Sequence, residues 1–428
     1  MKRIWWLALC LISLSGRGAG LPELVLPSGV GVNIHFVTGH EHELDLIRDA
    51  GFKFIRMDFG WESIERQKGQ YDWKEYDELL AHLEARGMRS VFILDYSNPL
   101  YEETVTSVNP VTHHEHKTLA SPQHPDSVAA YARWAAAAAK HYQGRQVIWE
   151  LWNEPNITFW NPKPDVNQYV TLALGACRAI RENLPDATIV GPASSTFPWP
   201  FLETVLKSGL LEYLDGVSVH PYRDPHRAPE TAVADYQRLR EMIDRYAPPA
   251  RKGKIPILSG EWGYSSWKKG VSPETQGTFA ARQQLSNLLN GVPLSIWYDW
   301  KNDGDDPYEN EHNFGTVLPD LKPKPAYRAI ATLTRELSGF RVVRRVKLET
   351  DQDYVLDCEN DKSERKLAAW TLAEPHEVTL PVSGLQGVSA CSCTGEALSV
   401  LPEFGRLRLM LNAGPQYLSL AGGRVKVP

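Results

Sequence analysis

The sequence predicts a (β/α)8 barrel followed by a small all-β domain, and three observations support this fold class. First, short β-rich runs alternate with amphipathic helical patterns eight times between residues 29 and 336, the order expected of a closed barrel. Second, no glycine-rich phosphate-binding loop follows the first β-rich run, which disfavours the competing architecture, an open doubly wound sheet. Third, helical patterns stop near Leu337, and alternating strand-like runs follow.

The predicted barrel strands are short runs rich in β-branched and aromatic residues. They are Gly29–Phe36, Phe52–Phe59, Ser90–Tyr96, Val147–Glu154, Thr188–Ser194, Gly216–Tyr222, Ile255–Trp262 and Leu294–Trp300. A helical pattern follows the last of them, as closure of a barrel requires. We assign residues 1–20 to an N-terminal signal or anchor, 21–336 to the barrel and 337–428 to a β-sandwich-like accessory domain.

Composition narrows the class of protein. The chain is 43% hydrophobic and 23% charged, which is ordinary for a globular protein and excludes wholesale disorder or a polytopic membrane protein. Its net charge is -6 and no long basic run is present, so a nucleic-acid partner is not expected. Small-molecule or glycan partners are favoured.

The first twenty residues are typical of a secretory signal. Lys2 and Arg3 precede an apolar run from Ile4 to Ile12, and small residues follow. We therefore expect an exported protein, periplasmic or secreted; an uncleaved inner-membrane anchor is the alternative, and membrane association is expected only through this segment.

The cysteines of an exported protein are candidates for a disulfide. Cys358 has two possible partners, Cys391 and Cys393, and spacing does not choose between them. Cys177 lies in an apolar helical pattern and is expected in the core.

Two glutamates end predicted strands and carry the functional hypothesis. Glu154 ends the fourth strand and Glu261 ends the seventh, and in a barrel the carboxyl ends of all strands meet at one rim. Two carboxylates flanking a substrate are what glycoside hydrolysis requires, one as proton donor and the other as nucleophile or base. Arg56, His220 and Tyr222, also at strand ends, are candidates to stabilise them.

The motifs "WELWNEPN" (149–156) and "LSGEWGYS" (258–265) resemble those of the retaining glycoside hydrolases of clan A. Within the clan the chain is most similar to glycoside hydrolase family 39, especially to PslG-like exopolysaccharide glycosidases. "HPY" (220–222) and "EHNFGTV" (311–317) add to the likeness, which covers roughly residues 30–335.

This resemblance implies roles for particular residues. Glu154 is the expected acid/base and Glu261 the expected nucleophile. The expected substrate-binding or charge-stabilising residues are Asn153, Arg56, Tyr222, Trp297, His312 and Asn313. The implied mechanism is retaining, through a covalent glycosyl-enzyme, and it requires no metal or organic cofactor.

Several other residues have a structural and a functional interpretation. We expect His35 and His220 to contact a sugar, and about half of Trp61, Trp160, Trp262, Trp267 and Trp300 to stack on one. Glu150 is expected inside the barrel, paired with Arg56. His113, His114 and His116 are interpreted as solvated residues of a long loop, from Ser97 to about Pro125, that walls the cleft, rather than as a metal site.

The sequence therefore predicts an exported retaining β-glycosidase, endo-acting on a polysaccharide such as a bacterial exopolysaccharide. One alternative is an exo-acting β-xylosidase or iduronidase-like enzyme. Another is a catalytically silent glycan-binding component of a polysaccharide export complex.

Overall fold

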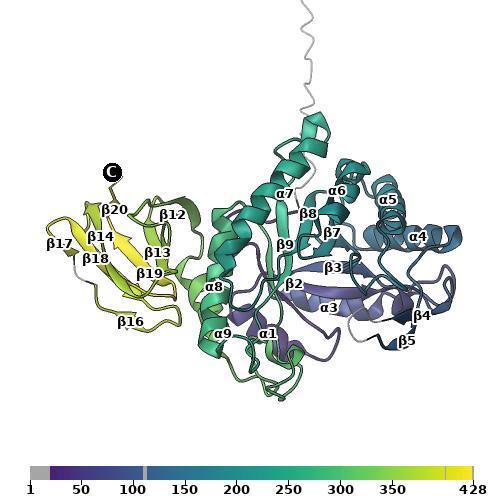
Figure 1. Cartoon of the computed structure of the whole chain (residues 1–428), viewed down its shortest axis with the longest axis horizontal. Coiled ribbons are helices and arrows are strands. Elements are labelled where there is room, and N and C mark those ends of the chain that lie inside the picture. The colour runs from purple at the N-terminus through teal and green to yellow at the C-terminus, as the bar shows by residue number, and fades with distance from the viewer. Residues whose placement is uncertain (1–19, 109–112, 401, 427–428) are drawn as a thin grey trace, which may run out of the picture.

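The computed structural model describes residues 20–108, 113–400 and 402–426, so the predicted signal or anchor lies almost wholly outside the described residues. Eight parallel strands close into a barrel surrounded by helices, and antiparallel sheets form the C-terminal part (Figure 1). This arrangement confirms the predicted fold class.

Each barrel strand overlaps one of the eight predicted runs. The strands are β1 (Val30–Asn33), β2 (Phe54–Gly60), β3 (Arg89–Asp95), β6 (Ile148–Leu151), β7 (Thr188–Ser195), β8 (Gly216–His220), β9 (Ile257–Trp262) and β10 (Ser295–Trp297). Around the barrel their order is β1-β10-β9-β8-β7-β6-β3-β2. The two candidate glutamates lie at the carboxyl ends of β6 and β9, which are separated by β7 and β8. Because all the strands are parallel, both of these ends lie at the same mouth of the barrel.

Helices pack around the outside of the barrel. They are α1 (Glu41–Asp49), α2 (Trp61–Ile64), α3 (Lys74–Ala85), α4 (Pro125–His141), α5 (Val166–Asn183), α6 (Trp199–Lys207), α7 (Val233–Tyr246), α8 (Pro273–Leu289) and α9 (Pro325–Glu336), with 3-10 turns η1 (Leu210–Glu212), η2 (Pro229–Ala232), η3 (Pro249–Arg251) and η4 (Glu311–Asn313). Local sequence fixes several starts: α4, α8 and α9 begin at a proline, and the side chains of Asp165 and Ser272 accept backbone N–H groups of α5 and α8.

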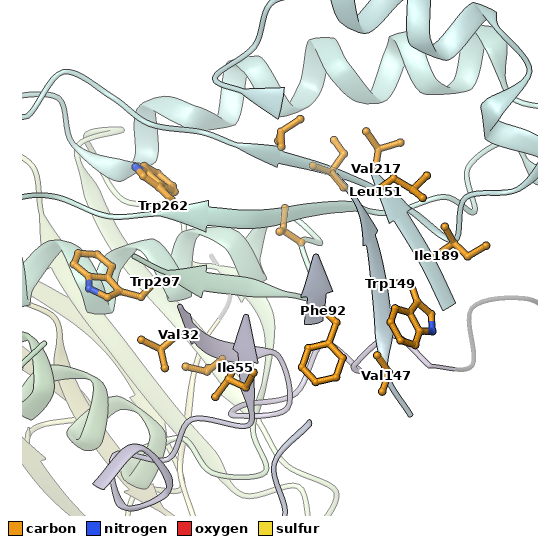
Figure 2. Close-up of a cluster of buried hydrophobic side chains, with 14 of the residues drawn as sticks. Val32, Ile55, Phe92, Val147, Trp149, Leu151, Ile189, Val217, Trp262 and Trp297 are labelled. Carbon is orange, nitrogen blue, oxygen red and sulfur yellow. The ribbon is translucent and has the colours of Figure 1, made fainter. Parts of the chain in front are cut away.

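The barrel sheet has an apolar layer on each face. Inside the barrel a small cluster fills the lower end: Phe54, Val91, Ile148, Val190, Leu258, Leu294 and Ile296. Outside it, a much larger cluster packs the strands against the helices, and Figure 2 shows part of this layer, including Trp262 and Trp297. Because the inner apolar layer is shallow, polar side chains occupy the barrel interior above it.

The long segment after β3 is more ordered than the predicted loop. It contains an antiparallel hairpin of β4 (Thr104–Val108) and β5 (Glu115–Leu119), in which Ser107 pairs with His116. Alternating Thr and Val residues in "TVTSV" favour a strand, which is the local reason for β4.

Two sheets build the C-terminal part. Its strands are β11 (Arg341–Arg345), β12 (Asp353–Glu359), β13 (Arg365–Thr371), β14 (His376–Ser383), β15 (Gly387–Cys391), β16 (Ala397–Leu398), β17 (Pro402–Glu403), β18 (Arg406–Leu411), β19 (Gln416–Ala421) and β20 (Arg424–Val425). The sheet orders are β11-β12-β13-β19-β15-β16 and β17-β18-β14-β20, with an apolar core between them.

This β part is firmly attached to the barrel. Arg282 of α8 forms two hydrogen bonds with the carboxylate of Glu230, at 2.8 and 2.7 Å, and Trp370 of β13 donates to the same carboxylate at 2.9 Å. The side chains of this ion pair are almost fully buried, and Trp370 belongs to the large barrel core. A buried interface of this kind leaves little freedom for relative motion.

The candidate disulfide is not formed in this structure. Cys177, Cys358, Cys391 and Cys393 are all free. Cys358 lies on β12 and Cys391 on β15, and β13 and β19 lie between these strands. Three strand spacings are about 14 Å, roughly twice the Cα separation that a disulfide can span.

Within the described residues, no helix is both long enough and apolar enough to cross a bilayer.

Candidate active site

A buried arginine organises the polar interior of the barrel. Arg56 points inward from β2 and its side chain is 1% exposed. Its guanidinium reaches five polar groups from other strands: Glu150 (2.6 Å), Glu261 (2.6 Å), Asn153 (2.9 Å), Asn33 (3.0 Å) and His220 (3.3 Å). Burial alone would lower the pKa of Arg56, but the charges of Glu150 and Glu261 outweigh it and raise the pKa. The guanidinium is therefore a fixed positive charge below the mouth.

Glu150 is the structural partner of this arginine, as the sequence predicted. Its side chain is 1% exposed, and its second oxygen accepts a hydrogen bond from Ser218. A charge so deeply buried requires a counter-charge, and Arg56 supplies it.

Glu261 reaches the mouth because β9 contains a bulge. Ser259 pairs with Ser295 and Trp262 with Trp297, so β9 has one residue more than β10 between the two pairs. A bulge of this type changes which face a side chain points to. The carboxylate of Glu261 accepts from Arg56 at 2.6 Å and from the hydroxyl of Tyr222 at 2.8 Å.

Gly260, beside Glu261, provides room rather than a special backbone conformation. A Cβ atom at this position would lie 2.2 Å from the Ser218 hydroxyl and 2.8 Å from a Glu150 oxygen. At Gly263 a Cβ would lie 1.8 Å from the Tyr298 carbonyl oxygen. Close packing against β8, β6 and the residue that follows β10 is therefore the physical reason for glycine at both positions.

Glu154 and Asn153 follow β6 on a strained backbone. Trp152 has φ 65° and Glu154 has φ 46°, a left-handed region that side chains of this size rarely occupy. The turn is held by the Glu154 amide, which donates to the Ala193 carbonyl at 3.0 Å, and by the Trp152 indole, which donates to the Phe159 carbonyl at 3.1 Å. This turn lifts the Glu154 side chain to the mouth while Asn153 points below it.

Asn153 uses both ends of its amide within the protein. Its oxygen accepts from Arg56, and its nitrogen donates to the hydroxyl of Tyr96 at 3.0 Å. The side chain is thus held in one orientation, with little of it exposed.

His220 holds the acid/base candidate and is not itself at the surface. Its Nε2 lies 3.3 Å from an Arg56 nitrogen and its Nδ1 lies 2.8 Å from Glu154 Oε1. Because a guanidinium only donates, Nε2 must accept, so Nδ1 carries the proton and donates to Glu154. The expected sugar contact at His220 is therefore wrong, since the ring is fully buried and both nitrogens are used.

The two candidate carboxylates meet at one point of the mouth. One oxygen of Glu154, one of Glu261 and a nitrogen of His220 all lie within 4.8 Å of one another. The side chains are 9% and 12% exposed, so neither is sealed from solvent. Among the described residues, Glu154 Oε2 has no hydrogen-bond partner, whereas both oxygens of Glu261 have one.

Tyr222 is placed as the sequence analysis expected. Its hydroxyl donates to Glu261, and burial, together with that carboxylate, raises the pKa of Tyr222 well above its usual range. It therefore stays protonated and remains a donor to Glu261.

Three tryptophans that were expected to contact substrate are buried instead. Trp262, Trp297 and Trp300 are 0–1% exposed and belong to the layer between strands and helices (Figure 2 labels Trp262 and Trp297). Trp300 donates to Glu43 of α1 at 2.7 Å. Trp297 is adjacent to Ile296, which faces the barrel interior, so alternation along the strand turns Trp297 outward.

Tyr298 takes the position at the mouth that the sequence analysis gave to Trp297. It is half-buried, its ring packs edge-on against His35 and Phe314, and burial followed by the charges of Asp299 and Glu261 raises its pKa. Tyr298 lies two residues after Ile296 and so on the same side of the strand, but only the structure shows that Ile296 faces inward.

Two residues of the motif after the eighth strand fasten a loop. Asn313 donates both amide hydrogens to the carbonyls of Asp306 and Glu309, at 2.9 and 2.8 Å. The ring of His312 lies against Gly304, where a Cβ would approach it to 2.6 Å. His312 and Asn313 therefore make contacts within residues 304–313, and a substrate contact at either residue stays a prediction.

His35 does lie at the mouth. Its side chain is 47% exposed, and Nε2 is 3.4 Å from Asp299 Oδ2. Burial opposes protonation of His35, but its contact with Asp299 raises the pKa overall. Burial also raises the pKa of Asp299, to about 7.

The fold and these carboxylates define a class of protein, a glycoside hydrolase of clan A, and comparison with known proteins agrees. Residues 28–304 match the family described as "Cellulase (glycosyl hydrolase family 5)". This match spans more than half of the chain, so the protein belongs to that family. No curated protein matches the chain.

Solved structures with the same fold cover most of the chain. A family 39 glycoside hydrolase from the gut symbiont Bacteroides cellulosilyticus WH2 is 25% identical, with a TM-score of 0.77, over 94% of this chain and 81% of that one. A family 39 β-xylosidase from Caulobacter crescentus is 19% identical, with a TM-score of 0.65, over 93% and 96%. A family 30 endoxylanase from Clostridium papyrosolvens C71 is 12% identical, with a TM-score of 0.64, over 96% and 98%.

Proposed function

We propose that the protein is a retaining β-glycosidase that cleaves within polysaccharide chains, with a bacterial exopolysaccharide as the substrate class. The observation that carries the retaining mechanism is the approach of Glu154 and Glu261 oxygens within 4.8 Å. Carboxyl groups lie about 5–5.5 Å apart in retaining glycosidases and about 6.5–9.5 Å apart in inverting ones, which need room for a water.

The hydrogen bonds around each carboxylate support different roles. Both oxygens of Glu261 accept a hydrogen bond, one from Arg56 and one from Tyr222, and these contacts hold the carboxylate in position as a nucleophile. Glu154 receives one donor, His220, at Oε1, which leaves Oε2 to carry a proton toward the leaving oxygen. In the first step Glu261 attacks the anomeric carbon while Glu154 protonates the departing oxygen. In the second, Glu154 takes a proton from water, which attacks the anomeric carbon and releases Glu261.

Exposed aromatic rings on opposite sides of the mouth support endo action. Phe159 follows β6 and is 42% exposed, and Tyr308 follows β10 and is 69% exposed. In the strand order, β6 and β10 are diametrically opposite. The Phe159 ring stacks on Tyr96, with centroids 5.9 Å apart, and Tyr96 contacts Asn153. A polymer crossing the mouth would meet an aromatic surface on either side of the carboxylates.

Three variants test the catalytic assignment. Glu154→Gln and Glu261→Gln should each lower polysaccharide cleavage, the first by about 10²–10⁴-fold. Glu309→Gln, an exposed acid of the loop after β10, is the control and should keep full activity. Cleavage at the native rate in Glu261→Gln would exclude this residue as nucleophile.

Two readouts test the mechanism and the mode of cleavage. Proton NMR of the first product should show retained anomeric configuration, and net inversion would contradict a covalent intermediate. Mass analysis of early products from defined polysaccharides should give a ladder of oligosaccharides, whereas release of only a monosaccharide would favour exo action.

We also propose that the chain is exported, from the charged and apolar pattern of its first twenty residues. Expression of the full chain in a bacterial host should yield a periplasmic or secreted form whose mass lacks about the first twenty residues. A full-length chain in the membrane fraction would instead indicate an anchor, and a full-length chain in the cytoplasm would refute export.

A further inference from the structure

A second group of metal-ligating side chains lies at the barrel mouth beside the carboxylate pair. His35 follows β1, and Asp299 and Asp303 follow β10, the strand that pairs with β1. One potential ligand atom from each of the three residues lies within 4.8 Å of the others. These side chains therefore converge from two neighbouring strand ends on one small volume.

Asp299 is the observation that points to a ligand. Its side chain is 1% exposed, and among the described residues neither of its oxygens has a hydrogen-bond partner. A buried carboxylate without partners is costly, so such groups are normally paired or bind a metal ion. The nearest cationic group, His35 Nε2, lies at 3.4 Å and does not form a well-directed hydrogen bond with it.

The nearby lysine does not satisfy this carboxylate. The ammonium group of Lys324 donates to Ser266, Asn302 and the carbonyl of Asn313, at 3.0–3.1 Å. Among the described residues, no lysine or arginine lies within 4.0 Å of Asp299. Apart from His35, no cationic side chain of the described residues therefore lies beside this buried carboxylate.

We propose that His35, Asp299 and Asp303 bind one divalent transition-metal ion. One imidazole nitrogen and two carboxylate oxygens form a mixed ligand set that suits Zn²⁺ or Mn²⁺ better than Ca²⁺, which prefers oxygen ligands alone. Three protein ligands leave coordination positions open to water or sugar hydroxyls. The ring of Tyr298 packs edge-on against His35, with centroids 5.6 Å apart, and holds the imidazole in place.

Two other clusters of the described residues have ligand atoms equally close, and each is a poorer site. In Glu154, His220 and Glu261 the ligand atoms already accept or donate hydrogen bonds, and the Arg56 cation contacts two of these residues. Glu41, Glu78 and His82 lie on α1 and α3 in partly or fully exposed positions, where hydration competes with binding. The His35 cluster alone contains a buried carboxylate without a partner.

Zinc binding to the full chain tests the proposal without any substrate. After removal of metal with EDTA, equilibrium dialysis against micromolar ZnCl₂ should show one tight equivalent of Zn²⁺ per chain. Asp303→Asn and His35→Ala change exposed side chains, so the fold should persist, and each should weaken this binding at least about tenfold. Asp299→Asn should do the same.

Matched variants exclude other locations for the ion. Asp305→Asn removes an exposed acid from the same loop, and His82→Ala disrupts the cluster on α1 and α3; both should bind Zn²⁺ like the parent chain. The proposal is overturned if no stoichiometric Zn²⁺ binds, or if Asp303→Asn and His35→Ala bind as tightly as the parent. Because binding is measured directly, failure here leaves the glycosidase proposal intact, and loss of hydrolysis does not affect the binding result.

Discussion

The ion pair between Arg56 and Glu150 allows a quantitative test of how buried charges compensate each other in the barrel interior. Both side chains are 1% exposed and their contact is 2.6 Å. In Arg56→Met, Glu150 keeps only its contact with Ser218, and Glu261 keeps only Tyr222. Water can reach Glu261, which is 12% exposed, but not Glu150.

The cost of Arg56→Met should therefore come mainly from Glu150. Removing one partner of a buried pair costs about 3–5 kcal/mol, because the other charge is left uncompensated. In the double variant Arg56→Met/Glu150→Gln that charge is absent. We expect the double variant to be more stable than Arg56→Met, and the two single costs to exceed the double cost by about 2–3 kcal/mol.

Equilibrium unfolding in urea, followed by tryptophan fluorescence and by far-UV circular dichroism, measures these free energies when the two transitions coincide. Arg145→Met is the control, because Arg145 and Glu84 form an exposed pair whose loss should cost at most about 1 kcal/mol. Additive single costs, or a cost of Arg56→Met no greater than that of the control, would refute the interpretation.

Three further outcomes follow from the site. Gly260→Ala should lower activity at least tenfold and reduce stability, since its Cβ would meet Glu150 Oε1 at 2.8 Å. The control is Gly175→Ala, whose Cβ would have its nearest neighbour at 3.6 Å, and it should be neutral or slightly stabilising in thermal unfolding. Tyr298→Ala should lower kcat/KM in steady-state assays by about tenfold or more, because a lost ring contact costs about 1.4 kcal/mol, which corresponds to a factor of ten. An unchanged kcat/KM would show that Tyr298 does not contact the substrate at the mouth. Burial lowers the pKa of Lys324 from 10.5 to about 8, so between these pH values the unfolded chain binds more protons than the folded chain, and the free energy of unfolding should rise with pH. Lys324→Gln should lack this rise when its unfolding in urea is measured across the same pH range. Equal pH dependence of the parent and the variant would contradict the prediction.

The fold class could be predicted from the sequence because the same strand-and-helix pattern occurs eight times. Eight β-rich runs alternate with helical patterns, and one missed hairpin, β4 and β5, does not change the topology. The same regularity located Glu154 and Glu261, since strand ends share a rim. The pairing of Arg56 with Glu150 was also predictable, because an inward charge in a barrel needs a counter-charge.

Side-chain direction at the upper ends of the strands was less predictable. The run "LSIWYDW" is apolar nearly throughout, as strands buried on both faces are, so alternation does not reveal that Trp297 faces the helices and Tyr298 the mouth. On β9 a bulge changes the alternation before Glu261, and such a bulge has no clear sequence signal.

Contacts between separate loops were the least predictable part. His35 and Asp299 are far apart in the sequence, and only the pairing of β1 with β10 brings them together. His220 ends a strand as a sugar ligand would, yet its two nitrogens are already used by Arg56 and Glu154. Position along a strand predicts proximity to the mouth, but not whether another side chain covers the group.

The arrangement around Arg56 also explains why Glu150 is ionic rather than apolar. Glu261 must lose its charge as it attacks, so an arginine devoted to Glu261 alone would stabilise the reactant more than the transition state. Glu150 contacts the same guanidinium at the same 2.6 Å distance as Glu261, and so shares its positive charge. The buried glutamate thus has two effects that offset the cost of its desolvation. It neutralises the charge of Arg56 in the barrel interior, and it limits how strongly Arg56 stabilises the charged form of the attacking carboxylate.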